Sequence, residues 1–196
     1  MLRYPTPMQL FLRIALLSFA SAALSQPVDA VLDRPVIDYQ RKEWRHWEDF
    51  DGDCQNTRQE LLIAQSQQEI RFTNDRGCTV AIGQWFDPYT GLLFSKASDV
   101  DIDHVIPLKY AHDHGGANWS PPLKKLFAND PENLLIVDDG ENQRKSAKGP
   151  ADYLPRFQYQ CEYAHTWQSV ARKYELQLAH RDTLIIERIL SNCKET

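Results

Sequence analysis

The segment 101–108, Asp-Ile-Asp-His-Val-Ile-Pro-Leu, places the strongest constraint on how this chain can fold. Its alternating acidic and aliphatic residues predict a β-strand, and Pro107 agrees with the strand ending there. Neighbouring side chains on a regular strand point to opposite faces of the sheet. Asp103 and His104 can therefore serve one site only where the strand ends or twists.

Two later segments complete the pattern. Residues 133–137, Asn-Leu-Leu-Ile-Val, predict a second strand. A helix is predicted from Glu141 to about Lys148, where Gly149 and Pro150 end it. The stretch between the two strands is predicted to be a long loop, with one short helix over 122–128. Two strands and a helix that converge on one point form a ββα unit, which we expect at about residues 97–150.

The flanking regions predict an α+β fold. Thr57 and Glu60 have the spacing of a capping box, which predicts a helix start. Residues 78–86 alternate and are rich in β-formers, so with the turn at 87–91 they predict a hairpin that leads into the central motif. Apolar side chains at helical spacing predict C-terminal helices; they are Tyr163, Trp167, Val170 and Tyr174, then Leu184, Ile185, Ile189 and Leu190.

Residues 1–25 have the composition of a secretory signal peptide. Arg3 and Arg13 precede a short apolar run, and small residues lead to a predicted cleavage after Ser25. The run is shorter than the ~20 residues that a membrane-spanning helix needs, which disfavours a membrane anchor. We therefore expect a secreted or periplasmic protein without stable membrane association, with one mature domain over 26–196.

The even number of cysteines predicts disulfides in an exported chain. The four residues are Cys54, Cys78, Cys161 and Cys193. Three pairings are possible, and we prefer Cys54–Cys78 with Cys161–Cys193 because this pairing closes local loops. Structural zinc is the alternative, but the sequence has no Cys-x-x-Cys pair to support it.

The net charge argues mildly against a nucleic-acid partner. The chain carries −5, and removal of the signal peptide takes away two arginines and no acid, which leaves −7. A nucleic-acid binder normally has a basic surface. Basic residues gather only locally, at Lys124-Lys125 and within 144–148. Binding of such a substrate is therefore expected to be weak and salt-sensitive.

The residues of the ββα unit nevertheless suit phosphodiester hydrolysis. His104 can be neutral near pH 7 and accept a proton from water. Asp103 and Asn142 offer oxygen ligands of the kind that hard divalent cations prefer. Lys145, one turn beyond Asn142, could neutralise phosphate charge. Asn133 is placed to bond backbone groups and to hold the long loop, and so to orient His104.

This motif resembles that of the HNH endonuclease family, whose core is a ββα-metal finger. Similarity to secreted bacterial members covers most of the mature chain, including the segments 51–60, 87–91, 127–130 and 150–155. The resemblance implies that Asp103 and Asn142 ligate a metal, that His104 is the general base and that Asn133 is the family's central asparagine. The third motif position is Asn142 here, where the family's name has histidine. Mg²⁺ is the implied metal, with Mn²⁺ or other divalents as alternatives.

Other polar groups have simpler interpretations. The acidic run 48–54 invites a calcium-loop interpretation, but a solvated turn tied down by Cys54 fits better. His112 and His114 are expected to be solvated loop histidines. Arg58 could contact phosphate, although exposure in the first turn of a helix explains it equally well. Asp101 shares a strand face with Asp103 and is a supporting candidate.

Two functions of different classes follow. The first is a secreted, monomeric, metal-dependent endonuclease acting on DNA, and on RNA as a second substrate, with little sequence preference because no reader module accompanies the core. The second is a non-catalytic exported protein that uses the same fold to bind metal and nucleic acid. The intact Asp103, His104 and Asn142 favour the first.

Overall fold

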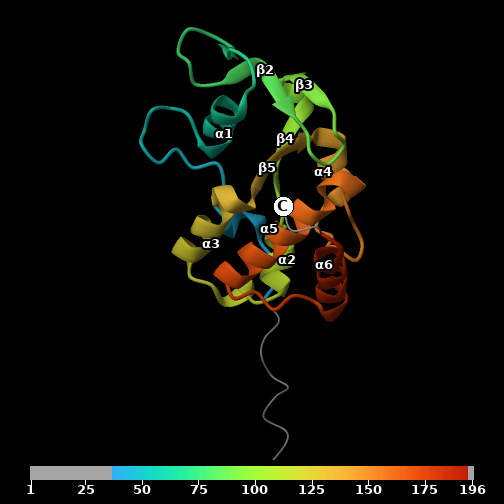
Figure 1. Cartoon of the computed structure of the whole chain (residues 1–196). Helices are drawn as coiled ribbons and strands as arrows, with labels where there is room; N and C mark the ends of the chain where they lie inside the picture. The colour runs from blue at the N-terminus through green and yellow to red at the C-terminus, as the bar shows by residue number, and fades with distance from the viewer. Residues whose placement is uncertain (1–36, 194–196) are drawn as a thin grey trace, which may run out of the picture. The chain divides into compact units, whose positions relative to one another are not determined.

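Two small antiparallel sheets organise residues 37–193, the part of the chain that this computed structural model describes (Figure 1). The first sheet has the order β1-β2-β3, with β1 at Arg71–Phe72, β2 at Val80–Phe86 and β3 at Leu93–Lys96. The second pairs β4, Val100–His104, with β5, Leu134–Asp138. With six α-helices around these sheets in the described part of the chain, the fold is α+β, as predicted. The predicted signal peptide lies outside the described residues.

The predicted hairpin is formed by β2 and β3. The turn between them is closed by the fully buried Asp87, whose carboxylate oxygens accept the backbone N–H groups of Tyr89 and Thr90 at 2.8 and 3.1 Å. Gly91 follows with φ of 82°, a left-handed conformation that glycine adopts without steric cost. The turn buries the ring of Tyr89, which is only 2% exposed.

Helix α1, Thr57–Gln65, is present, but the predicted capping box is wrong. The cap is Asn56, whose side chain accepts the backbone N–H of Gln59. The hydroxyl of Thr57 donates instead to the side-chain oxygen of Asn129 at 2.9 Å. The Thr57 hydroxyl, which the capping-box pattern assigns to the start of the helix, thus bonds a distant residue, Asn129, instead.

The connection from β4 to β5 contains two helices rather than the single one predicted. Helix α2, Leu108–Asp113, begins directly after Pro107, and α3, Pro121–Ala128, is the expected short helix. The solvated-loop interpretation of His112 is wrong, because this side chain is 3% exposed and its Nε2 bonds the Ile37 carbonyl.

Helix α4, Asp139–Lys145, follows β5 at once and completes the ββα arrangement. Val100 and Ile102 on β4 belong to the apolar cluster between the sheets and α1. Asp101 and Asp103 face α4 from the other side of the strand, where each bonds an α4 side chain. The alternation of β4 thus separates a core face from a polar face, as a regular strand requires.

The C-terminal helices form as predicted and are tied together. Helix α5 spans Gln160–Lys173 and α6 spans His180–Asn192. Both preferred disulfides are present: Cys54–Cys78 joins the loop before α1 to the start of the hairpin, and Cys161–Cys193 joins α5 to the end of α6.

Candidate active site

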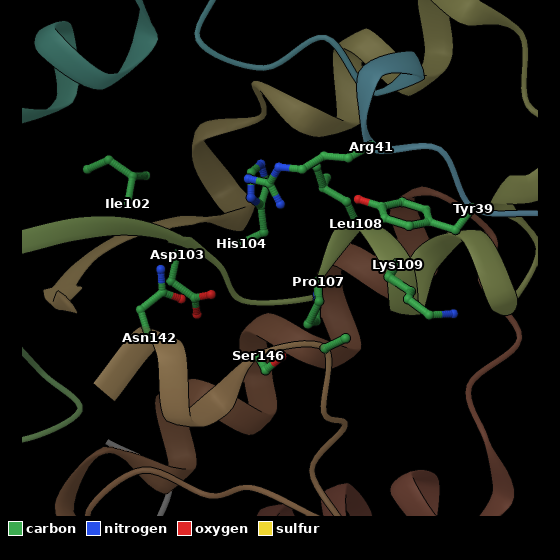
Figure 2. Close-up of a pocket in the computed structure, with 11 residues that line it drawn as sticks. Tyr39, Arg41, Ile102, Asp103, His104, Pro107, Leu108, Lys109, Asn142 and Ser146 are labelled. Carbon is green, nitrogen blue, oxygen red and sulfur yellow. The ribbon is translucent and has the colours of Figure 1, made fainter. Parts of the chain in front are cut away.

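A pocket of about 310 Å³ opens where β4 ends beside α4 (Figure 2). Its lining includes three of the predicted site residues, Asp103, His104 and Asn142. The strand ends at His104, so Asp103 and His104 reach the same pocket although they leave the strand on different sides. This is the geometry that the sequence motif required.

His104 is held in one tautomer by its contact with α3. Its Nε2 lies 2.8 Å from the carbonyl oxygen of Ala128. Because a carbonyl only accepts, Nε2 carries the proton and Nδ1 carries the lone pair of the neutral ring. Burial, opposed by this hydrogen bond, lowers the pKa of His104 from 6.5 to about 3. The imidazole is therefore neutral at pH 7, with its lone pair on Nδ1.

Asp103 is buried between a cation and a phenol. The ammonium of Lys145 lies 3.0 Å from each carboxylate oxygen, and the Tyr89 hydroxyl donates to Oδ2 at 2.8 Å. Asp103 is 4% exposed and Lys145 is fully buried. Burial raises the pKa of Asp103 and lowers that of Lys145, in each case against the attraction of the partner. Each charge thus depends on the other for its place in the interior.

Lys145 has a different environment from the one its helical spacing predicted. Besides Asp103, its ammonium donates to the backbone carbonyl of His104 at 2.9 Å. The side chain is fully buried, so its charge is directed at the end of β4 instead of at solvent. A direct contact with phosphate would require it to leave both partners.

Asn142 is oriented by the second acidic residue of the strand. Its amide nitrogen donates to Asp101 Oδ2 at 3.1 Å, which leaves the amide oxygen available on the pocket side. Asp101 in turn lies 3.8 Å from the Arg58 guanidinium, which also donates to the carbonyls of Ala97 and Val100. Arg58 is thus a partly buried brace for β4 rather than an exposed residue.

Asn133 is fully buried and holds the backbone that follows His104. Its side-chain oxygen accepts the N–H of Ile106 at 2.8 Å, and its amide donates to the carbonyl of the same residue at 3.1 Å. Its own backbone carbonyl accepts the N–H of Val105. These contacts are of the kind that the sequence predicted for this asparagine.

Several residues at the site were not found from the sequence. Tyr39 and Arg41 line the pocket, and the Trp47 ring stacks on His104 with centroids 5.7 Å apart and an interplanar angle of 26°. Trp47 has φ of 57°, which is unusual for a bulky residue. These three lie in a segment without regular spacing, so no local pattern could identify them. The contact of Tyr89 with Asp103 likewise depends on a tertiary approach.

A second group of carboxylates, away from the pocket, could also hold a metal ion. Oxygens of Asp49, Asp51 and Asp53 lie within 4.8 Å of one another, and all three residues are exposed. Glu60 stands eleven positions after Asp49, and Cys54 between them has φ of 73°. In the structure, oxygens of Asp49 and Asp53 accept backbone N–H groups of the turn. Glu60 is not a member of this group, and the predicted solvated turn tied down by Cys54 agrees with these contacts.

Comparison with known proteins identifies the family. The family model for the C-terminal domain of GmrSD restriction endonucleases matches residues 51–183 of this sequence, which is more than half of the chain. This chain belongs to that family. It is therefore related to nucleases, and the matched range contains both strands and the helix of the ββα unit. No solved structure matches the chain.

A relative described as an uncharacterized secreted protein comes from the fungus Arthroderma benhamiae. It is 36% identical over 162 residues, which cover 81% of this chain and 78% of the relative. The resemblance is thus not confined to bacterial proteins. Among the helices of residues 37–193, none is long and apolar enough to cross a membrane.

Proposed function

We propose that this protein is a secreted, divalent-metal-dependent endonuclease of the HNH type, which hydrolyses phosphodiester bonds of nucleic acid with little sequence preference. DNA is the expected substrate and RNA a second one. The proposal rests above all on the pocket in which Asp103, His104 and Asn142 meet at the junction of β4 and α4. Membership of a nuclease family supports the reaction class, and the secreted relative and the two disulfides support export.

The residues of the pocket fit an oxygen-preferring divalent cation. The Asp103 carboxylate retains lone pairs beyond its bonds to Lys145 and Tyr89, and the Asn142 amide turns its nitrogen to Asp101 and so keeps its oxygen free. Two protein oxygens with water as the remaining ligands is a donor set that suits Mg²⁺, with Mn²⁺ as an alternative. When bound, such a cation stabilises charge at the phosphate and at the leaving oxygen.

The general base in this proposal is His104. Nδ1 accepts a proton from the attacking water while the Ala128 carbonyl keeps the proton on Nε2. The water oxygen bonds to phosphorus, and the bond to the leaving oxygen breaks. A phosphate anion beside the ring favours the imidazolium that forms, so substrate itself strengthens the base.

The other two predicted site residues, Asn133 and Lys145, are proposed to hold His104 and Asp103 in place. Asn133 fixes the backbone at Val105 and Ile106 and so keeps His104 at the strand end. We assign Lys145 the task of compensating the buried charge of Asp103, in place of a direct phosphate contact, because its ammonium is enclosed by Asp103 and the His104 carbonyl. With these contacts, His104 and Asp103 are held in position before substrate binds.

Plasmid cleavage by the purified, oxidised protein tests the proposal. We expect nicking and linearisation with Mg²⁺, none in EDTA, and at least a 100-fold loss of rate in His104→Ala, in line with the usual contribution of a general base (about 10²- to 10⁴-fold). His165→Ala, on the exposed side of α5, is the matched control and should cleave like the wild type. Cleavage in EDTA, or full activity of His104→Ala, contradicts the mechanism.

The same experiment separates the alternative function. If the protein binds DNA in a gel-shift assay but leaves it intact with every divalent metal tried, the non-catalytic binding protein is the correct interpretation. Asp103→Asn then serves as a second test, because loss of metal binding without loss of fold identifies Asp103 as a ligand.

A further inference from the structure

The pocket has three cationic side chains nearby, and two of them already have carboxylate partners. Lys145 is buried against Asp103, and Lys109, which lines the pocket, binds Asp113 at 2.7 Å. Arg41 also lines the pocket, and within residues 37–193 it forms no ion pair with a carboxylate. Its neighbours are the Tyr39 hydroxyl and the His46 ring nitrogen, and the 3.5 Å to that nitrogen is long for a hydrogen bond.

The segment that carries Arg41 is firmly attached to α3. We call residues 39–48 the N-terminal strap. Glu43 and Glu48 of the strap bind Lys124 and Lys125 at 2.8 and 2.7 Å. Asn129, next to the Ala128 that holds His104, donates to the Arg45 carbonyl at 2.7 Å and accepts the Glu48 N–H at 3.2 Å.

The strap thereby places Arg41 on the open side of the site. Figure 2 shows the guanidinium reaching toward His104 from the blue ribbon of the strap, with Asp103 and Asn142 beyond the ring. Trp47 of the same strap packs on His104, so strap and base are held to each other. The strap precedes residue 51, where the family match begins.

From this geometry we propose that Arg41 binds the phosphate group that is cleaved, and that the strap is the element that delivers it. The inference rests on the proposed nuclease function for the identity of the phosphate. A guanidinium offers a planar pair of N–H donors that matches two phosphate oxygens. A chain of net charge −7 without its first 25 residues needs such a local cation to admit a polyanion.

The test combines kinetics with a binding measurement that needs no cleavage. Arg41→Ala should lower kcat/KM for a short oligodeoxynucleotide about 10- to 100-fold, the usual effect of losing a hydrogen bond to a charged group. Arg41→Lys should recover only part of this, because lysine is a point charge without the paired donors. Lys42→Ala, an exposed neighbour outside the pocket lining, is the matched control and should change kcat/KM less than twofold.

Binding of inorganic phosphate in EDTA is followed by NMR shifts of the Arg41 side-chain N–H and of the His104 ring. We expect saturable binding in the wild type and in Lys42→Ala, and at least a tenfold weaker Kd in Arg41→Ala. Circular dichroism confirms that each variant is folded.

The two proposals fail in distinguishable ways. Arg41-dependent phosphate binding without cleavage leaves the anion site intact and overturns the nuclease proposal. Cleavage by Arg41→Ala at the wild-type kcat/KM, or phosphate binding that Arg41→Ala does not weaken, overturns the role of Arg41 while the nuclease proposal stands.

Discussion

The buried ion pair of Asp103 and Lys145 is a contact between two single residues on which the site depends. Both side chains are almost completely removed from water, and their partners are limited to each other, Tyr89 and one backbone carbonyl. Burying a pair of charges gains little over burying apolar groups, but removing one partner leaves an uncompensated charge. The pair therefore makes the site costly to alter.

Replacement of Lys145 by methionine tests this dependence. We expect Lys145→Met to lower the free energy of unfolding by about 3–5 kcal/mol, since Asp103 keeps its buried carboxylate without a counter-charge. Urea denaturation of the oxidised protein measures it. Lys148→Met, at an exposed lysine three residues after the end of α4, should change stability by less than about 0.5 kcal/mol. Equal stability of Lys145→Met and wild type would show that Asp103 is not held as a charge.

At the scale of elements, α3 connects three parts of the site. The carbonyl oxygen of its last residue, Ala128, accepts the Nε2–H of His104, and the side chain of the next residue, Asn129, bonds the strap and the start of α1. The position of the base, the strap and the helix that braces β4 therefore all depend on the end of one short helix.

Asn129→Ala should affect activity and stability together. It removes the side-chain partners of the Arg45 carbonyl and the Glu48 N–H, and one of the two acceptors of the Thr57 hydroxyl, so we expect a loss of about 2–4 kcal/mol. The catalytic rate per folded molecule should also fall, because the strap and the Ala128 carbonyl lose their anchor. Asn118→Ala, an exposed asparagine, is the control. An unchanged rate per folded molecule means that α3 orients His104 without help from Asn129.

The sequence predicted those helices and strands that are determined by residues within or next to them. The hairpin follows from alternation and the turn at Asp87, and β4 ends as Pro107 suggested. Helix α4 also forms, but it begins at Asp139 without the predicted polar turn and ends at Lys145 rather than near Lys148. Helix α2 was missed because its buried histidine interrupts any simple apolar stripe. The cap of α1 was misassigned because Thr57 is engaged by Asn129, 72 positions away.

The pocket was predicted in part for the same reason. Its motif residues have a fixed spacing on two strands and a helix, which the sequence displays directly. Tyr89 reaches Asp103 only through folding of the hairpin, and Arg41 reaches the pocket only through folding of the strap. No spacing rule connects either residue to the motif.

For the whole molecule, the two disulfides connect segments that the sheets leave separate. Cys54–Cys78 closes a separation of 24 residues and Cys161–Cys193 one of 32. In the chain-entropy view, such bridges stabilise by restricting the unfolded state, and loops of these lengths differ little in effect.

Removal of each bridge should therefore cost a similar amount. We expect the Cys161→Ala/Cys193→Ala and Cys54→Ala/Cys78→Ala variants each to lose about 2–5 kcal/mol of unfolding free energy. Thermal unfolding with and without reductant gives an independent comparison, in which reduced wild type should lose the effect of both bridges. Detection of free thiols in the non-reduced protein would contradict the pairing.

Because Trp47 stacks on His104, tryptophan fluorescence can report on the state of the site. An indole in contact with an imidazole changes its emission when that ring gains a proton or moves, so Trp47 is a built-in optical reporter of the general base. Phosphate or nucleic acid that enters the pocket should alter tryptophan fluorescence in the wild type and not in Trp47→Phe. Occupancy of the site could then be followed in real time, on unlabelled protein, even in a variant that no longer cleaves.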